Sequence, residues 1–273
     1  MTMVLDPSWL QRLEAQVDAP PVAPRAPLGV LVGASPSAAV IGSIDATLAL
    51  RLAGAGLPLR DSGEAWQIEV PNTAAIDPTL AAIAHWLHAN GLAGGWRNEL
   101  LAVVDAAGQP IGTVERAVVR PLGIATHAVH LVVRDPDGAA WVQQRAFDKA
   151  VDPGLWDTTM GGLVAAGESI AATLARETWE EAGLRLDALA EIRSLGRVTV
   201  RRPVADGYMV EHIEVFDALA PIDLLPVNQD GEVARFERLA RPALIARLHA
   251  DAFTIEAALI LAQAVKRAGQ SAR

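Results

Sequence analysis

The chain has 273 residues and a formal net charge of −9, and 51% of its residues are hydrophobic. This length suggests one large domain or two of modest size, and the apolar content excludes a globally disordered chain. The acidic balance makes non-specific binding to nucleic acid or to anionic membranes a poor match, and the absence of cysteine excludes disulfides, cysteine-ligated metals and thiol nucleophiles.

The amino terminus carries Asp6 and lacks the basic segment and apolar core of a secretory signal. The longest uncharged stretch, residues 26–44, is interrupted by Pro36 and by several glycines and serines. It therefore predicts a buried strand and loops rather than a membrane span. We expect a cytoplasmic protein that binds neither membranes nor nucleic acid.

The first part of the chain mixes helical and extended patterns. Trp9, Leu13 and Val17 fall at helical spacing, so residues 8–17 are predicted to form an amphipathic helix. The prolines between positions 20 and 27 exclude a helix and predict a stiff connector. After it we expect a strand over 28–32, helices over 44–55 and 79–93, and strands over 96–104 and 111–119 around a turn at 105–110.

A second unit is expected to begin near Pro121. It comprises strands over 127–134 and 140–144, a helix after the glycine-rich segment 161–167, strands over 192–200 and 209–219, and a closing helix over 253–268. This alternation favours an α/β sandwich. We expect a smaller α+β domain over residues 1–120 and the sandwich over residues 121–273.

The chemistry is concentrated in the helix between Ser169, a suitable N-cap, and Gly183, a suitable C-cap. Glu177, Glu180 and Glu181, here called the acidic stripe, fall within an arc of roughly 100° on this helix. Their mutual repulsion and the helix dipole both oppose this placement, whereas a hard divalent cation such as Mg²⁺ would favour it. The alternative is a solvated acidic face. The face expected to pack on a sheet carries Ala171, Ala175, Thr178 and Ala182.

The acidic stripe is part of a longer pattern that resembles the Nudix box, Gly-x5-Glu-x7-Arg-Glu-U-x-Glu-Glu-x-Gly-U, where U is apolar. The matching positions are Gly162, Glu168, Arg176, Glu177, Glu180, Glu181, Gly183 and Leu184. Thr178, at the first U position, is the one soft departure. A pattern of this length is far more specific than a short glycine motif.

The resemblance implies a Nudix fold, an α/β/α sandwich, and hydrolysis of a diphosphate joined to another group, with Mg²⁺ or Mn²⁺ as cofactor. Carried over by position, Glu180 and Glu181 resemble the main metal ligands. Glu177 resembles a ligand or the base that activates water. The cation would polarise phosphoryl oxygens and lower the pKa of the attacking water.

The same resemblance implies supporting roles for residues around the stripe. Arg176 would orient the carboxylates, Glu168 would support the loop or a second metal, and the Gly161 carbonyl would complete the metal shell. Glu211 and Glu214 are candidates for a further ligand or base, or are ordinary strand-edge acids. The identity of the general base stays open.

Upstream of the helix, Arg145 and Lys149 follow a predicted strand and are candidates for binding the diphosphate. The alternative is a pair of surface cations in a loop. Trp156 either forms a wall of the substrate pocket or belongs to the core.

The block around these residues also resembles isopentenyl-diphosphate isomerase, a Nudix-fold enzyme of a different reaction class. That enzyme uses a cysteine in the segment just before the helix, which here reads Thr159-Met160-Gly161-Gly162. Because the chain has no cysteine, we expect hydrolysis rather than isomerisation.

Motifs outside the box resemble one Nudix subfamily, in which an uncharacterised N-terminal domain precedes the Nudix module. These motifs include residues 96–100, 114–117, 122–131, 157–162 and 230–233. The subfamily occurs in fungal thiamine-pyrophosphokinase-like proteins and in plant and bacterial Nudix hydrolases, and it is linked to hydrolysis of oxo- and oxythiamine diphosphate. Trp96 and Arg97 are then candidates for reading an aromatic ring and a phosphate, or are a buried Trp beside an ion pair.

We therefore expect a Mg²⁺-dependent pyrophosphatase that converts thiamine diphosphate, or its damaged analogues, to the monophosphate and phosphate. The N-terminal domain is expected to contribute to substrate recognition. Two alternatives stay open: a hydrolase of nucleoside-diphosphate derivatives such as ADP-ribose, and a non-catalytic Nudix-fold binding or regulatory protein. The expected partner is a small-molecule diphosphate, and a homodimer is compatible with the family.

Overall fold

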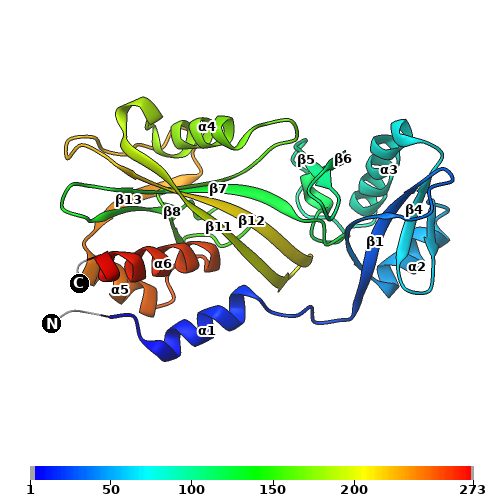
Figure 1. The fold of residues 1–273 in the computed structure, drawn as a ribbon, viewed down its shortest axis with the longest axis horizontal. Helices are drawn as coiled ribbons and strands as arrows, with labels where there is room; N and C mark the ends of the chain where they lie inside the picture. Colours follow the sequence, from blue (N-terminus) through cyan, green and yellow to red (C-terminus); the bar gives the residue numbers. More distant parts are fainter. Residues whose placement is uncertain (1–3, 272–273) are drawn as a thin grey trace.

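The computed structural model describes residues 4–271, with side chains described as far as Arg267. Its largest sheet lies between two layers of helices, which confirms the expected α/β/α sandwich (Figure 1). One layer is α4 (Ile170–Ala182). The other contains α1 (Pro7–Val17), α5 (Arg241–His249) and α6 (Ile255–Ser271). A smaller unit with its own sheet lies at one end of the sandwich (Figure 1).

The sheet of the sandwich has the strand order β11-β12-β7-β8-β13. Its strands are β7 (Thr126–Arg134), β8 (Ala140–Arg145), β11 (Ala190–Val204), β12 (Gly207–Leu219) and β13 (Val233–Leu239). β12 runs parallel to β7, and the other neighbours pair antiparallel.

The hairpin of β7 and β8 opens soon after its turn. The two strands pair at Arg134 and Ala140. Farther along, the short strand β10 (Met160–Leu163) pairs with β7, and β9 (Trp156–Asp157) pairs with β8. This opening brings the glycine-rich segment into the sheet, directly before α4.

Apolar side chains cover both faces of the sheet. On the α6 side, Trp9 of α1 and Leu261 of α6 pack in one cluster with Ile213 of β12. On the α4 side, Leu174 packs in a second cluster with Val129 of β7. Successive residues of a strand point to opposite faces, so β7 contributes to both clusters.

The smaller unit has a core of its own, built from residues between Leu28 and Ile124. Its four-stranded sheet has the order β2-β1-β4-β3. Its elements are β1 (Arg25–Val32), β2 (Ala39–Asp45), α2 (Ala46–Gly54), β3 (Leu59–Asp61), β4 (Trp66–Val70), α3 (Ile76–Ala89), β5 (Leu100–Val104) and β6 (Pro110–Glu115). Short 3-10 helices lie at Thr73–Ala75 and Arg116–Val118 here, and at Leu186–Ala188 after α4 in the sandwich.

Several element boundaries differ from those predicted, and two of the differences have a clear local cause. The strand expected over 96–104 begins at Leu100, because Asn98 has a left-handed backbone, with φ 56°, that a strand does not accommodate. The helix expected from Ile44 begins at Ala46, because the Asp45 carboxylate accepts a hydrogen bond from the Leu48 N–H at 2.9 Å and caps it.

The hydrophobic clusters do not divide the chain into two units at residue 120. α1 packs with the sandwich: Trp9, Leu13 and Val17 are buried in the cluster that contains α6. The functional division into residues 1–120 and 121–273 stays a prediction. No helix within residues 4–271 is long and apolar enough to cross a membrane.

Candidate active site

α4 begins and ends at the predicted caps. The Ser169 hydroxyl accepts a hydrogen bond from the Ala172 N–H at 3.2 Å. At the other end Gly183 has φ 61°, and a Cβ at this position would lie 2.5 Å from the Val227 carbonyl oxygen. Both the left-handed backbone and the crowding require glycine there.

The buried face of α4 differs from the predicted one. Thr178 and Ala182 are buried as expected, but Ala171 and Ala175 are exposed, so that part of the prediction is wrong. The buried residues are Thr173, Leu174, Thr178, Glu181 and Ala182. The helix is rotated so that Glu181, a member of the acidic stripe, turns into the protein. The spacing of the alanines does not show which face of α4 is buried. The burial of the bulkier Leu174 and the hydrogen bonds of Glu181 determine that face.

Two glycines of β10 make room for polar side chains, Gly162 for Glu177 and Gly161 for His130. A Cβ at Gly162 would lie 2.1 Å from Cδ of Glu177, and a Cβ at Gly161 would lie 2.5 Å from Cε1 of His130. The Gly161 N–H also donates to Oε2 of Glu181 at 2.9 Å. A side chain at either position would displace a polar residue of the site.

Arg176 holds the carboxylates in place. Its guanidinium donates to both oxygens of Glu168, at 2.9 and 2.7 Å. It also donates to Glu177 at 2.7 Å and to Glu180 at 2.9 Å. One cation thus lies beside two members of the acidic stripe and joins them to the loop before α4. Its role in catalysis stays a prediction.

Burial is the largest influence on the pKa of Glu177 and of Glu181. Burial raises the pKa of Glu181 to about 8, opposed by hydrogen bonds from the Gly161 N–H and from Gln143 and by the charge of Lys149. Burial also raises the pKa of Glu177, opposed by Arg176. The hydrogen bonds from Arg176 instead lower the pKa of Glu168 to about 2. Glu168 is therefore a permanent anion at neutral pH.

Lys149 and Glu232 form a charged pair near the acidic stripe. The Lys149 side chain is 19% exposed, and its charge acts on the pKa of Glu181. Burial alone would raise the pKa of Glu232, but the hydrogen bond from Lys149 lowers it. The Ala146 N–H donates to the Glu232 carbonyl at 2.9 Å and joins the two loops. The structure therefore brings Lys149 to the site.

Arg145 turns toward its own loop. Its guanidinium donates to the Val151 carbonyl at 3.3 and 3.0 Å and lies 3.6 Å from a carboxylate oxygen of Asp157. These contacts support the loop that carries Lys149. A direct role for Arg145 in binding a diphosphate stays a prediction.

Glu211 and Trp156 lie away from the acidic stripe. Alternation along β12 places Glu211 on the face of Ile213, which α6 covers, and its carboxylate accepts from the Thr126 hydroxyl at 3.2 Å. Burial raises the pKa of Glu211 to about 7. Trp156 is 7% exposed and lies in the core, with the guanidinium of Arg247 4.3 Å from the centroid of its ring.

Trp96 and Arg97 are not brought to the acidic stripe either. The Trp96 ring lies 5.0 Å from that of His85 and 4.9 Å from that of His88, and its N–H donates to Asn98 at 2.9 Å. Arg97 is exposed. Its backbone N–H donates to the Glu115 carboxylate at 2.9 Å, so the recorded contacts of both residues lie within the smaller unit.

Sequence reasoning did not single out two residues of the site, Gln143 and Glu232. The Gln143 side-chain amide donates to Oε2 of Glu181 at 2.9 Å, and its own carbonyl oxygen is buried without a hydrogen-bond partner among the described residues. A polar residue in the middle of an apolar strand was the available signal for Gln143. Glu232 depends on the meeting of two loops, which no local pattern predicts.

The donor chemistry of the acidic stripe fits a hard divalent cation. Three carboxylates supply oxygen ligands, and the hydrogen bonds from Arg176, Gly161 and Gln143 hold one oxygen of each. A bound cation would also favour the charged forms of Glu177 and Glu181, which burial disfavours. Within residues 4–267 no three His, Asp or Glu side chains already converge as a ligand set.

Known proteins share this arrangement of sequence and fold. A family model for the NUDIX domain matches residues 125–259. An uncharacterized Nudix hydrolase of Pseudomonas aeruginosa is 41% identical over 146 residues, covering 54% of this chain and 80% of that protein. Isopentenyl-diphosphate Delta-isomerase of Leifsonia xyli is 35% identical over 159 residues, covering 56% of this chain and 83% of that protein.

Other relatives are longer or more distant. Nudix hydrolase 20, chloroplastic, of Arabidopsis thaliana is 32% identical over 164 residues, and the match spans 58% of this chain and 43% of the plant protein. A Deinococcus radiodurans protein of known crystal structure has the same fold, with a TM-score of 0.50, 24% identity, and coverage of 62% of this chain and 98% of that chain. The chain belongs to the Nudix family and is a hydrolase of acid anhydrides in phosphorus-containing substrates.

Proposed function

We propose that the protein hydrolyses the diphosphate group of a small molecule, with Mg²⁺ or Mn²⁺ held by the acidic stripe. One observation carries this proposal: Glu177 and Glu181 are packed over the backbone of Gly161 and Gly162, where burial disfavours their charge. A divalent cation bound between them would offset this cost and favour the charged form of both carboxylates.

Each residue of the site would have its own role. Glu177, Glu180 and Glu181 would hold the cation, which when bound polarises phosphoryl oxygens and lowers the pKa of water. Arg176 keeps Glu177 and Glu180 in one orientation. Lys149 would exchange Glu232 for a phosphate oxygen of the substrate, since an ammonium group binds either anion as a point charge.

The smaller unit is proposed to line the substrate site on one side. The Ala166 N–H, in the loop before α4, donates to the Leu100 carbonyl of β5 at 2.8 Å. Arg116, just after β6, is 43% exposed in its ion pair with Glu99. Its charge acts on the pKa of both Glu211 and Glu232, in each case behind the larger effect of burial. These contacts support a role for the β5–β6 hairpin in substrate recognition.

The proposed substrates are thiamine diphosphate and its oxidised analogues. The choice rests on the subfamily motifs at 96–100, 114–117 and 230–233. Two of these three segments lie in or beside the β5–β6 hairpin, and the third carries Glu232, the partner of Lys149. The motifs therefore border the site at which we place the substrate.

Isomerisation is a second candidate, because an isopentenyl-diphosphate Delta-isomerase is among the similar proteins. The block before α4 favours hydrolysis instead. The isomerase resemblance requires a cysteine there, and the chain carries Thr158, Thr159 and Met160, all buried. No thiol is available elsewhere in the chain.

A phosphate-release assay separates these possibilities. The purified protein is incubated with Mg²⁺ and thiamine diphosphate, oxythiamine diphosphate, ADP-ribose or isopentenyl diphosphate, with and without a phosphatase. Cleavage of a terminal anhydride releases phosphate directly. Cleavage of ADP-ribose yields two phosphate monoesters and is detected only when the phosphatase is added, and isomerisation releases none.

We expect direct release from the thiamine-type diphosphates. Turnover of ADP-ribose alone would overturn the substrate assignment but keep the hydrolase. Isomerised isopentenyl diphosphate without hydrolysis of any compound would overturn the proposed reaction.

A further inference from the structure

Gln143 is a polar side chain in the interior of the sandwich whose presence packing does not explain. It lies in β8 and is 2% exposed. Its backbone N–H donates to the Thr158 carbonyl at 3.3 Å. Its side-chain carbonyl oxygen, in contrast, is buried and has no hydrogen-bond partner among the residues whose side chains are described. A buried oxygen without a donor lowers stability, so a glutamine at this position needs another reason.

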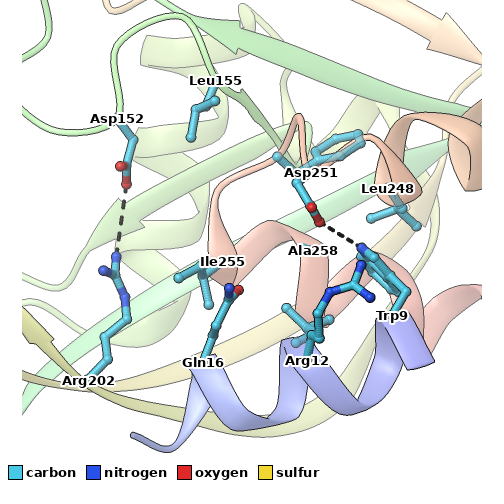
Figure 2. A pocket seen from close by; sticks show the side chains of 12 residues that line it. Trp9, Arg12, Gln16, Asp152, Leu155, Arg202, Leu248, Asp251, Ile255 and Ala258 are labelled. Atoms are coloured by element: carbon cyan, nitrogen blue, oxygen red, sulfur yellow. Dashed lines mark hydrogen bonds and ion pairs between the residues drawn. The ribbon is translucent and has the colours of Figure 1, made fainter. Parts of the chain in front are cut away.

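The polar side chains around the cavity between α1 and α6 differ from Gln143 in this respect. The cavity has a volume of about 270 Å³ and lies on the opposite face of the sheet from α4 (Figure 2). Arg202 lies 4.0 Å from Asp152 there, and Asp251 accepts from the indole N–H of Trp9 at 2.8 Å. Arg12 is exposed to solvent. These groups are paired or hydrated, so they need no ligand.

The neighbours of Gln143 in β8 show that its position suits an apolar side chain. Val142 is buried in the cluster on the α6 side, and Trp141, on the same face as Gln143, packs against the cluster on the α4 side. An apolar side chain of similar length would extend the second cluster and would bury no unpaired oxygen. The amide is the group that distinguishes glutamine from such a side chain.

The amide nitrogen of Gln143 donates to Oε2 of Glu181 at 2.9 Å. The reverse orientation of the amide would place its oxygen against a carboxylate oxygen, and a charged carboxylate has no hydrogen atom to donate. The contact with Glu181 therefore fixes the amide, and the carbonyl oxygen stays unpaired as a result.

Glu181 receives hydrogen bonds from both sides of the opening in the sheet. Gly161 belongs to β10, which pairs with β7, and Gln143 belongs to β8, which pairs with β9. Both donate to the same oxygen, Oε2, at 2.9 Å. Oε1 accepts no hydrogen bond from the described part of the chain and, unlike the carbonyl oxygen of Gln143, is open to solvent. Glu181 therefore has one fixed oxygen and one free oxygen.

We propose that Gln143 is a positioning residue of the metal site and acts through Glu181. A carboxylate held by the Gly161 N–H alone could turn about that single contact, whereas a second donor on the other side fixes it. Gln143 thereby keeps Oε1 of Glu181 free for the divalent cation, as Arg176 holds the other two members of the acidic stripe. This role rests on the proposed function, because it requires that the acidic stripe binds a cation.

A titration of the full chain with Mn²⁺, followed by electron paramagnetic resonance, tests this role without a substrate. Gln143→Met keeps the length of the side chain and removes the amide. We expect this variant to bind Mn²⁺ at least about tenfold more weakly than the natural protein, because Glu181 loses a hydrogen bond to its charged group. Gln143→Asn keeps an amide on a shorter side chain that does not reach Glu181, and it should weaken the uptake as well.

Gln67→Met is the matched control, at a half-buried glutamine of β4 in the smaller unit. It should bind Mn²⁺ as the natural protein does, and circular dichroism verifies that each variant is folded. Folded Gln143 variants that bind Mn²⁺ as tightly as the natural protein would overturn the positioning role and leave the proposed function intact. Absence of Mn²⁺ uptake by the natural protein would overturn the proposed function and this role together.

A double-mutant comparison shows whether Gln143 acts through Glu181. Glu181→Gln removes the charge to which the amide of Gln143 donates. Glu177 and Glu180 remain in this background, and their weaker uptake is measured at higher Mn²⁺ concentration. Adding Gln143→Met should then change the uptake by less than about twofold, because the two residues act as one unit. A further loss of about tenfold would show that Gln143 acts independently of Glu181 and would contradict the proposal.

Discussion

At the scale of single residues, Gly162 shapes the site as much as the glutamates do. Glu177 occupies the space that a side chain at this position would need, because a Cβ at Gly162 would lie 2.1 Å from Cδ of Glu177. We expect Gly162→Ala to displace Glu177, to lower kcat/KM sharply, and to cost about 1–3 kcal/mol in the free energy of unfolding because a packed carboxylate must move.

The matched control is Gly54→Ala at the end of α2, where a Cβ would meet nothing within 4 Å. This change should leave activity intact and stability unchanged or slightly raised. Steady-state kinetics and urea unfolding measure both variants. Equal behaviour of the two would show that Glu177 does not depend on the space at Gly162.

A substitution of Glu180 is expected to change activity without changing stability. Its side chain is 42% exposed, so replacing it with an isosteric amide disturbs little packing. Glu180→Gln should lower kcat/KM with Mg²⁺ by about 100-fold or more, equivalent to roughly 3 kcal/mol. The melting temperature should change little.

The control for Glu180→Gln is Glu64→Gln, which changes an exposed acid of the smaller unit. It should be indistinguishable from the natural protein in both activity and stability. Full activity of Glu180→Gln would refute a role for this carboxylate in holding the cation.

Sequence reasoning reached part of the site at this scale. The charged residues of the box meet as its spacing indicates, because they lie on α4 and in the loop before it, where Arg176 contacts Glu168, Glu177 and Glu180. The pairing of Lys149 with Glu232 joins segments far apart in the chain, so only tertiary structure reveals it. Their roles in catalysis stay predictions.

At the scale of elements, the caps of α4 fix which face the acidic stripe presents. Ser169→Ala removes the hydrogen bond to the Ala172 N–H and should cost about 1 kcal/mol of stability. Thermal unfolding followed by circular dichroism measures the loss. Ser37→Ala, at an exposed loop serine, is the control and should change nothing. Equal melting temperatures for the two variants would show that this cap contributes nothing.

The strongly periodic elements were predictable and the short ones were not. α1 and α4 carry several turns of helical spacing and clear caps, and both lie where expected. β3 and β4 are 3 and 5 residues long, too short for their pattern to predict a strand. α5 and β13 were missed as well, because their buried residues are few and interrupted by charged ones. Such segments are ordered by the layers they join rather than by their own pattern.

At the scale of the whole molecule, α1 near the start of the chain packs against α6 near its end. Trp9 is 3% exposed in the cluster shared with α6, although 100 residues of the smaller unit separate α1 from the sandwich in sequence (about 25–124). Trp9→Ala should therefore destabilise the sandwich by about 3–5 kcal/mol in urea unfolding. Trp179→Ala, at a 50% exposed tryptophan of α4, should cost about 1 kcal/mol or less.

A small effect of Trp9→Ala, equal to that of Trp179→Ala, would show that α1 is not part of the sandwich core. The sequence predicted the helix itself but assigned it to the N-terminal domain. Amphipathic spacing shows that a helix has a face to bury and does not say which core covers it.

The most direct test of the proposed metal site is a titration with Mn²⁺ followed by electron paramagnetic resonance, with methylene bisphosphonate as a diphosphate that resists hydrolysis. If the acidic stripe holds the cation against phosphate oxygens, the signal of free Mn²⁺ should fall as protein is added, and more steeply with the bisphosphonate present. Glu177→Gln and Glu180→Gln should each weaken this uptake, whereas Glu64→Gln should not. Uptake that is absent, or that is the same in all of these variants, would contradict a metal-dependent hydrolase at this helix.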